Sequence, residues 1–130
     1  MKHLIFILTL YISTIFTACG QTKSIGAKQS IDLTTVDFIE IRKQSGQADT
    51  IQTNRKRLTN EQNILFVDKW NAGNSNGPCK FIVLYWVDIT FKDKTKRTFR
   101  VNGKNIKEKS DFCFDLGNSK YIEQLWRKTK

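Results

Sequence analysis

The sequence predicts an α+β domain in which two helices pack on a small antiparallel sheet of about five strands, in the order ββα-βββα. Three observations lead to this prediction. Several short segments are rich in β-branched and aromatic residues, two others carry apolar residues at helical spacing, and turn-forming Gly and Asn residues separate them. The segments expected to be strands are 36–43, 50–58, 80–91, 95–102 and 106–114.

The first two strands are expected at 36–43 and 50–58, joined by a turn at 45–47. The segment VDFIEIRK at 36–43 is rich in β-forming residues, whereas the second strand is polar enough to lie at an edge of the sheet. The basic triplet at 55–57 would then discourage pairing with the edge of another sheet, which gives these charges a structural role.

The first helix is expected to begin at Thr59 and to end near Asn71. Thr59 can cap the first turn while Gln62, three residues later, reaches back to the Thr59 backbone, which is the capping-box pattern. Gly73 then permits a left-handed turn that ends the helix. The apolar residues at helical spacing are Phe66, Val67 and Trp70.

The strongest strand is expected at 80–91, after a loop at 71–78 that contains the only proline. Its odd-numbered residues form one apolar face. The other face carries Ile82, Leu84 and Trp86. A strand that is apolar on both faces is normally covered on both.

The remaining elements are short strands and a terminal helix. Residues 92–94 are expected to form a turn, and the Asn-Gly pair at 102–103 a hairpin turn after the next strand. Gly117 ends the last strand, and Ser119 is expected to cap a helix whose basic end suits the negative end of the helix dipole. The apolar stripe of that helix consists of Tyr121, Ile122, Leu125 and Trp126.

The start of the chain has the features of an export signal. Lys2 and His3 precede an apolar run at 4–16 that is too short for a convincing permanent membrane helix. The residues Thr17-Ala18-Cys19 resemble the lipobox of bacterial lipoproteins, in which a small residue precedes a cysteine.

The lipobox resemblance implies that Cys19 is acylated, becomes the first mature residue and holds the chain on the membrane. Phe16 departs from the pattern, which usually has Leu at that place. Ordinary signal cleavage after Gly20 is the alternative, because Ala18 and Gly20 are small residues two apart.

Three regions follow from this interpretation: a signal peptide at 1–18, the lipidated cysteine with a flexible tether at 19–35, and a single α+β domain at 36–130. The segment proposed as a tether is small and polar with little periodicity. We therefore expect the protein at the bacterial cell envelope, anchored in a membrane by lipid and facing the periplasm or the outside.

The chain is strongly basic, with a formal net charge of +10. Such a charge indicates either a solvated surface or contact with an anionic partner, such as lipid headgroups, surface glycans or an acidic protein. Nucleic acid is the usual partner inferred for so basic a chain. An exported protein seldom meets nucleic acid, however, and no recognised nucleic-acid motif is present, so we expect no such partner.

The catalytic chemistry open to this chain is narrow, because its only histidine is His3, inside the expected signal peptide. This excludes Ser-His-Asp and Cys-His sites from the mature domain, and no glycine-rich phosphate loop is present. The cysteine spacing also lacks the four ligands of an ordinary zinc site. We therefore expect no catalytic residue, no cofactor and no metal.

Acid–base chemistry by carboxylates stays open. Asp88 follows Trp86 on the same strand face, where an aromatic neighbour can raise the pKa of a carboxyl group. The alternative is that the strand simply reaches solvent there. The other candidate carboxylates are Asp93, Asp111 and Asp115.

Two cysteines follow Cys19, namely Cys79 and Cys113, and an exported protein can hold a disulfide. In a simple meander the two would fall near opposite ends of the sheet, whereas a bond needs Cα atoms within about 7 Å. A loop at 103–110 that redirects the last strand would bring them together, so both outcomes stay open.

The even-numbered face of the strongest strand is the best candidate for an interaction surface. If no element covers it, Ile82, Leu84 and Trp86 form an exposed apolar patch rimmed by basic residues, and such patches mark binding sites. A covering segment is the alternative. The expected partner-binding group is Trp86 with the basic side chains of Arg97 and Arg100.

Together these features favour a non-enzymatic, lipid-anchored domain that binds an anionic component or an acidic protein at the cell envelope. An envelope enzyme that uses carboxylates without histidine is one alternative, and a passive structural lipoprotein is another. Small periplasmic inhibitor and immunity lipoproteins have a similar overall design, although no motif assigns the chain to them.

Overall fold

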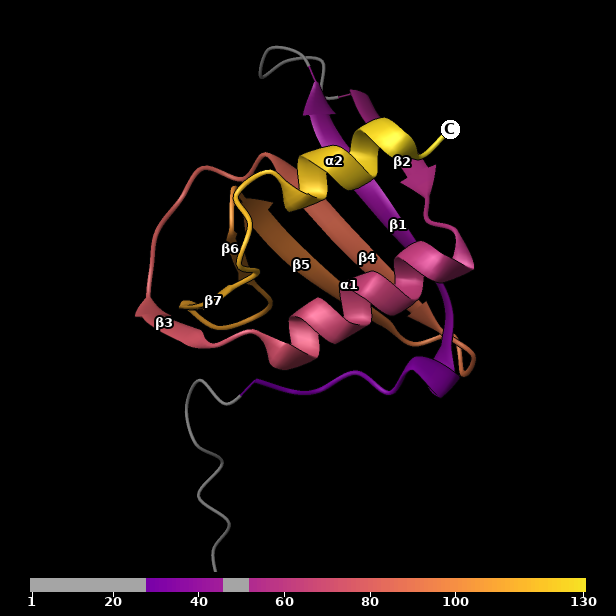
Figure 1. Ribbon diagram of the computed structural model, residues 1–130, viewed down its shortest axis with the longest axis horizontal. Helices are drawn as coiled ribbons and strands as arrows, with labels where there is room; N and C mark the ends of the chain where they lie inside the picture. The colour runs from indigo at the N-terminus through magenta and orange to yellow at the C-terminus, as the bar shows by residue number, and fades with distance from the viewer. Residues whose placement is uncertain (1–27, 46–51) are drawn as a thin grey trace, which may run out of the picture.

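Two helices lie on one face of a seven-stranded antiparallel sheet in the computed structural model, which describes residues 28–45 and 52–130 (Figure 1). The α+β class with two helices follows the prediction, whereas the sheet has more strands than the five or so expected. In chain order the elements are the 3-10 helix η1 (Leu33–Thr35), β1 (Val36–Ser45), β2 (Gln52–Arg57), α1 (Asn60–Ala72), β3 (Ser75–Pro78), β4 (Tyr85–Phe91), β5 (Lys96–Asn102), β6 (Asn105–Lys107), β7 (Phe112–Asp115) and α2 (Tyr121–Lys128).

The strands follow the order β2-β1-β4-β5-β6-β7-β3, so that β2 and β3 are the two edges. Two strands differ from the prediction. β3 lies in the expected loop at 71–78 and pairs with β7, and the expected last strand at 106–114 is divided between β6 and β7. The sequence SNGP of β3 has neither apolar alternation nor β-branched residues, so nothing local indicates a strand there.

The expected strand at 80–91 is shorter than predicted, because β4 begins only at Tyr85. Residues 79–84 instead connect β3 to β4. The Leu84 backbone pairs with Val101 and Gln44, and the Cys79 N–H donates to the Asp111 backbone oxygen. The sequence pattern is apolar throughout, and it does not reveal that most of this connection lies outside the ladder.

The core lies between the sheet and the two helices. Most side chains of β1, β4 and β5 that point to this side are buried, and α1 packs on them through aromatic rings. The ring centroid of Trp70 is 4.7 Å from that of Phe99 and 5.2 Å from that of Phe114, both in edge-to-face geometry. The fully buried strand residues on this face are Ile39, Ile41, Val87, Ile89, Phe99, Val101 and Ile106.

The ends of the helices agree with the prediction in part. Thr59 and Gln62 form both hydrogen bonds of the capping box at the start of α1. Gly73 does end α1, but its φ of −62° is extended and not left-handed. Glycine is needed there for a different reason, because a Cβ atom would lie 2.8 Å from the Asp115 carbonyl oxygen. Ser119 does not cap α2, whose N-cap residue makes no side-chain cap hydrogen bond.

The segment at 28–35 packs against α1 and is not part of a free tether. Lys28 Nζ donates hydrogen bonds to three backbone carbonyl oxygens at the C-terminal end of α1, at 2.5–2.7 Å, where the helix dipole favours a cation. The Asn71 side chain pairs with both backbone polar groups of Ile31, which is buried. The folded domain therefore begins earlier than predicted.

The expected signal peptide at 1–18, Cys19 and the rest of the expected tether up to residue 27 lie outside the described residues. Within the described ranges, no helix has both the length and the apolar character needed to cross a membrane.

Candidate binding face

The sheet face opposite the helices carries charged and aromatic side chains, and we call it the open face. It consists of the side chains of β2, β1, β4 and β5 that alternate with the core residues, and neither described helix lies on it (Figure 1). The predicted interaction surface belongs to this face, since Trp86 alternates with the buried Tyr85 and Val87 of β4.

A line of five side chains runs along this side of the sheet, one from each of five adjacent strands. Four belong to the open face, and the fifth, Lys107 of β6, is buried at 6% exposed. In the strand register Arg55 lies opposite Arg42, Arg42 opposite Trp86, Trp86 opposite Arg100, and Arg100 opposite Lys107. We call these residues the basic row. Because adjacent strands lie about 4.8 Å apart, the row extends over about 19 Å.

Trp86 is the centre of the basic row, with a basic residue on each side. The Arg42 guanidinium carbon lies 5.3 Å from the centroid of the Trp86 ring, within the range of a cation–π contact. Arg100 occupies the opposite position on β5, and both Trp86 and Arg100 are partly exposed. The structure therefore places two of the three predicted binding residues side by side.

Asp88 fixes the position of Arg42 and is not free for acid–base work. It accepts hydrogen bonds from Nε and Nη2 of Arg42, the latter at 3.0 Å, and from Thr98 Oγ1 at 2.7 Å. The paired side chains are mostly buried, at 21% and 14% exposed. Asp88 therefore preorganises a guanidinium beside Trp86, and a bidentate pair of this kind holds it in one orientation.

The positive charge of the open face is only partly balanced. Arg55 and Arg57 both approach the single carboxylate of Glu40, at 3.7 and 3.9 Å, and their side chains remain more than half exposed. Arg100 Nη2 donates to the backbone oxygen of Glu108, at 2.9 Å, and no described carboxylate forms a salt bridge with Arg100. Three arginines therefore keep the capacity to bind further anionic groups.

Arg97 does not join the other predicted binding residues. It lies on the covered side of β5, next to the buried Phe99, and forms two 2.9 Å bonds to the Glu108 carboxylate. Its guanidinium also donates to the backbone oxygens of Gln29 and Ser30. Arg97 thus fastens the N-terminal segment to the sheet, and including it in the binding group was wrong because odd and even residues of a strand point to opposite faces.

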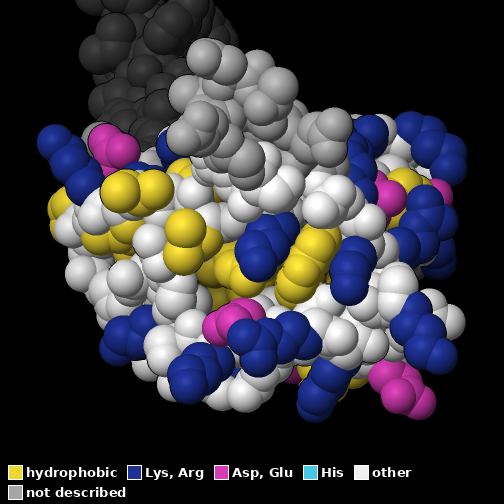
Figure 2. Space-filling view, turned by 90° about the horizontal axis from the view of Figure 1, so that it is seen from above, with side chains coloured by type: hydrophobic (Ala, Val, Ile, Leu, Met, Phe, Trp, Pro, Cys, Tyr) yellow, Lys and Arg dark blue, Asp and Glu magenta, His cyan; other side chains and the backbone are white. Residues whose placement is uncertain are grey.

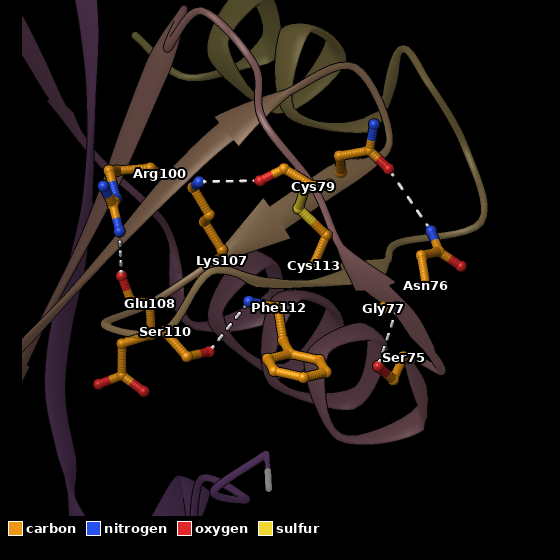
Figure 3. Close-up of a disulfide and its surroundings, with 11 residues drawn as sticks. Ser75, Asn76, Gly77, Cys79, Arg100, Lys107, Glu108, Ser110, Phe112 and Cys113 are labelled. Atoms are coloured by element: carbon orange, nitrogen blue, oxygen red, sulfur yellow. Dashed lines mark hydrogen bonds between the residues drawn. A yellow bond between two sulfur atoms is a disulfide. The ribbon is translucent and has the colours of Figure 1, made fainter. Parts of the chain in front are cut away.

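Cys79 and Cys113 are joined by a disulfide, with their Cα atoms 5.7 Å apart (Figure 3). β4 to β7 do form a meander, but Cys79 is not at its start. Cys79 directly follows β3, and β3 pairs with β7 and places Gly77 opposite Cys113. Lys107 Nζ, at one end of the basic row, donates to the Cys79 backbone oxygen at 3.2 Å. The connection after β3 is thus fixed to the sheet at its first residue.

The other candidate carboxylates serve local structure. Hydrogen bonds from the Thr95 side chain and backbone lower the pKa of Asp93. Hydrogen bonds from Lys104 and from the Gly117 backbone lower the pKa of Asp115. Both shifts are opposite in direction to the one a general acid needs. Asp111 is exposed, and the described part of the chain contains no group of three or more His, Cys, Asp and Glu side chains placed to hold a metal.

A hollow of about 340 Å³ opens at the end of the sheet near α2, lined by residues of β1, β4, α2 and the turn between β5 and β6. Figure 2 looks onto this end of the molecule, where apolar side chains lie among Lys and Arg side chains, which outnumber the acidic ones in this view. The basic surroundings therefore extend from the open face to this end.

No family model, curated protein or solved structure matches the chain. Any assignment of function must therefore come from the residues and geometry described above.

Sequence reasoning missed three members of the basic row: Lys107 beside Arg100, and Arg42 and Arg55 on the other side of Trp86. Arg42 and Arg55 lie in expected strands, so strand alternation could have predicted on which face of its strand each side chain lies. Which residue of another strand lies opposite Trp86 depends on register, however, and the register between β1 and β4 joins segments that are far apart in the chain.

Proposed function

We propose that the protein is an exported, lipid-anchored and non-enzymatic binding domain of the bacterial cell envelope, and that its open face binds an anionic partner. One observation carries this proposal: three arginines and a tryptophan lie in register across the uncovered side of the sheet. Arg and Trp are the residue types that most often dominate binding energy at interfaces.

The charge balance of the open face supports an anionic partner. Arg55, Arg57 and Arg100 keep unpaired hydrogen-bond donors, while the two nearby carboxylates, Glu40 and Asp88, are already engaged with arginines. A carboxylate or phosphate that approaches this face would therefore meet available guanidinium groups and little repulsion.

The state of the acidic residues supports binding in preference to catalysis. Asp88, the foremost candidate acid, is held by Arg42 and Thr98, and hydrogen bonds lower the pKa of Asp93 and Asp115. The sequence after residue 3 also contains no histidine. These features therefore favour binding, because the open face offers no free carboxylate or histidine as a general acid or base.

The binding proposal is tested with a soluble polyanion, dextran sulfate, titrated against the purified mature chain. The double variant Trp86→Ala/Arg100→Glu should weaken binding by at least about tenfold, because it removes the centre of the row and reverses one charge. Lys128→Glu is the matched control, since it reverses an exposed charge on α2 without touching the open face.

Circular dichroism must show that the double variant keeps its fold. If Lys128→Glu weakens binding as much as the double variant does, the chain binds polyanions through its overall charge, and the open face is not the site.

The anchor is tested separately by Cys19→Ala. This variant should leave the membrane fraction of cells that express the full chain, because the acceptor of the acyl chains is gone. Retention in the membrane fraction at the level of the unmodified chain would overturn the assignment of Cys19 as the lipidated residue.

A further inference from the structure

Two large aliphatic side chains just before β4 stand in solvent. Ile82 is 79% exposed and Leu84 is 47% exposed, which makes Ile82 the most exposed large apolar side chain that the structure describes. Burial of such side chains is worth about 1.5–3 kcal/mol each, so their exposure is costly unless they meet an apolar surface. They belong to the connection between β3 and β4.

This connection runs along the open-face side of the sheet. Asn102 Nδ2 donates to the Ile82 backbone oxygen at 2.7 Å, and Lys107 Nζ donates to that of Cys79 at 3.2 Å. Both donors lie on that side of the sheet, because Lys107 ends the basic row and Asn102 alternates with Arg100 two residues away. Figure 3 shows Lys107 reaching Cys79 beside the disulfide.

The exposed aliphatic side chains are held in place and are not at a frayed end. The disulfide fixes Cys79 to β7, and the Leu84 backbone is hydrogen bonded to the sheet on both sides, through Val101 and Gln44. Ile82 and Leu84 therefore project from a connection fastened at both ends. Because the two side chains are already held in position, less conformational entropy is lost when they bind an apolar surface.

The combination of residues distinguishes among anionic partners. A hydrophilic polyanion such as an acidic glycan would bind the arginines but would leave Ile82 and Leu84 without an apolar contact. A bilayer that contains anionic lipids offers both: headgroup phosphates for Arg55, Arg57 and Arg100, and the acyl-chain boundary for aliphatic and indole side chains.

We propose that the open face lies against a membrane surface rich in anionic lipids, with Ile82 and Leu84 inserted at the interface and the exposed arginines Arg55, Arg57 and Arg100 on the headgroups. This inference rests on the proposed function and names the anionic partner. The residues from Cys19 to Lys28 could span no more than about 30 Å even if fully extended, so an acylated Cys19 would keep the open face within reach of the bilayer.

The test uses the mature chain with Cys19→Ala, so that no acyl chain contributes, and measures sedimentation with vesicles. We expect binding to vesicles of phosphatidylcholine mixed with phosphatidylglycerol and little binding to phosphatidylcholine alone. The double variant Ile82→Asn/Leu84→Asn, which keeps the net charge, should weaken binding to the mixed vesicles by at least about tenfold.

The control is Ile64→Asn/Leu65→Asn, which alters an equally apolar pair on α1, 45% and 56% exposed, on the covered side of the sheet. This variant should bind the mixed vesicles like the parent chain. Equal weakening by both double variants would mean that general surface hydrophobicity drives binding, and would overturn the assignment to the open face.

Insertion depth gives a second, independent readout. Lipids brominated on their acyl chains should quench the fluorescence of Trp86, and Trp86→Phe should remove that quenching, because Trp70 is buried at 1% exposed and Trp126 lies on α2, on the covered side of the sheet. Binding to mixed vesicles without quenching would show purely electrostatic contact and contradict insertion.

The remaining outcomes separate this inference from the proposed function. If the chain binds dextran sulfate through the open face but not the mixed vesicles, the proposed function stands and the membrane assignment fails. Poly-glutamate and alginate serve as probes for an acidic protein and an acidic glycan. If either binds more tightly than the vesicles and Ile82→Asn/Leu84→Asn leaves that binding unchanged, the membrane assignment is wrong.

Discussion

The two faces of the central sheet differ in what they contact, although the same strands form both. On the covered face, most side chains of β1, β4 and β5 are buried under α1 and α2. On the open face, the neighbouring residues of those strands present arginines, carboxylates and Trp86, which pair with one another and stay partly exposed. One face therefore stabilises the fold, and the other is available for a partner.

This contrast shows how strand alternation divides two tasks within a few residues. Phe99 and Arg100 are neighbours in β5, yet Phe99 packs against Trp70 while Arg100 lies opposite Trp86. The face of the strand on which a side chain lies therefore decides its role more than its chemical type does. Arg97 and Arg100 are both arginines of β5, but Arg97 lies on the covered face and pairs with Glu108. Substitutions on the two faces should separate stability from binding.

The largest expected effect is on the covered face. Phe99→Ala should reduce the free energy of unfolding by about 3–5 kcal/mol, because it leaves a cavity between Phe66 and Trp70. Trp86→Ala should cost much less, since its ring is only partly buried. Urea denaturation of both variants measures the comparison, and an equal loss would mean that the open face is also part of the core.

The disulfide should have the next largest effect. Replacing both Cys79 and Cys113 with Ser should lower the free energy of unfolding by about 2–4 kcal/mol, because the bond closes a loop with a sequence separation of 34 residues. Urea denaturation of the parent chain with and without reductant checks the value independently. No change on reduction would show that β3 and its connection are held without the bond.

A smaller effect is expected for the ion pair on the open face. Asp88→Asn should reduce the free energy of unfolding by about 1–2 kcal/mol, because Arg42 loses a charged, mostly buried partner. The control is Asp37→Asn, which removes an exposed salt bridge to Lys94 and should cost about 0.5 kcal/mol or less. Equal costs would indicate that Asp88 does not hold Arg42 in place.

The smallest expected effect is on the dependence of folding stability on acidic pH. Asp93 and Asp115 have pKa values below the ordinary 3.8, so the unfolded chain binds more protons than the folded one as the pH falls through this range. Their contribution to stability is complete above that pH and is lost as the pH falls through the folded-state pKa values. The variant Asp93→Asn/Asp115→Asn should therefore show a shallower loss of stability below about pH 4.

Urea denaturation at several acidic pH values measures this slope in the parent chain and in the variant. A variant with an unchanged slope would contradict the role given to the hydrogen bonds of Thr95, Lys104 and Gly117.

Local signals in the sequence predicted much of the fold. The capping box at Thr59 was confirmed, and the hairpin expected at 102–103 forms with its turn one residue later, at 103–104, because each signal depends on residues within one turn of chain. β3 was missed because its sequence SNGP forms a strand only by pairing with β7, far along the chain. The docking of Lys28 on α1 is likewise a long-range contact with no local pattern.

The residues of the candidate site also fall into two groups: those that local sequence signals predict and those that depend on long-range strand pairing. The face of β4 that carries Trp86 followed from alternation, and Arg100 could be placed beside it because β4 and β5 are joined by a short turn. Arg42 and Arg55 depend on the pairing of β1 with β4 and β2, which sequence periodicity does not specify.

The most direct test of the open face as the binding surface follows the three tryptophan indole N–H signals by NMR during titration with dextran sulfate. The Trp86 signal should shift as the ligand is added, while the signal of the buried Trp70 stays in place. A titration that shifts the signal of Trp126 on α2 and leaves that of Trp86 unchanged would place the binding surface on the helical side and contradict the account.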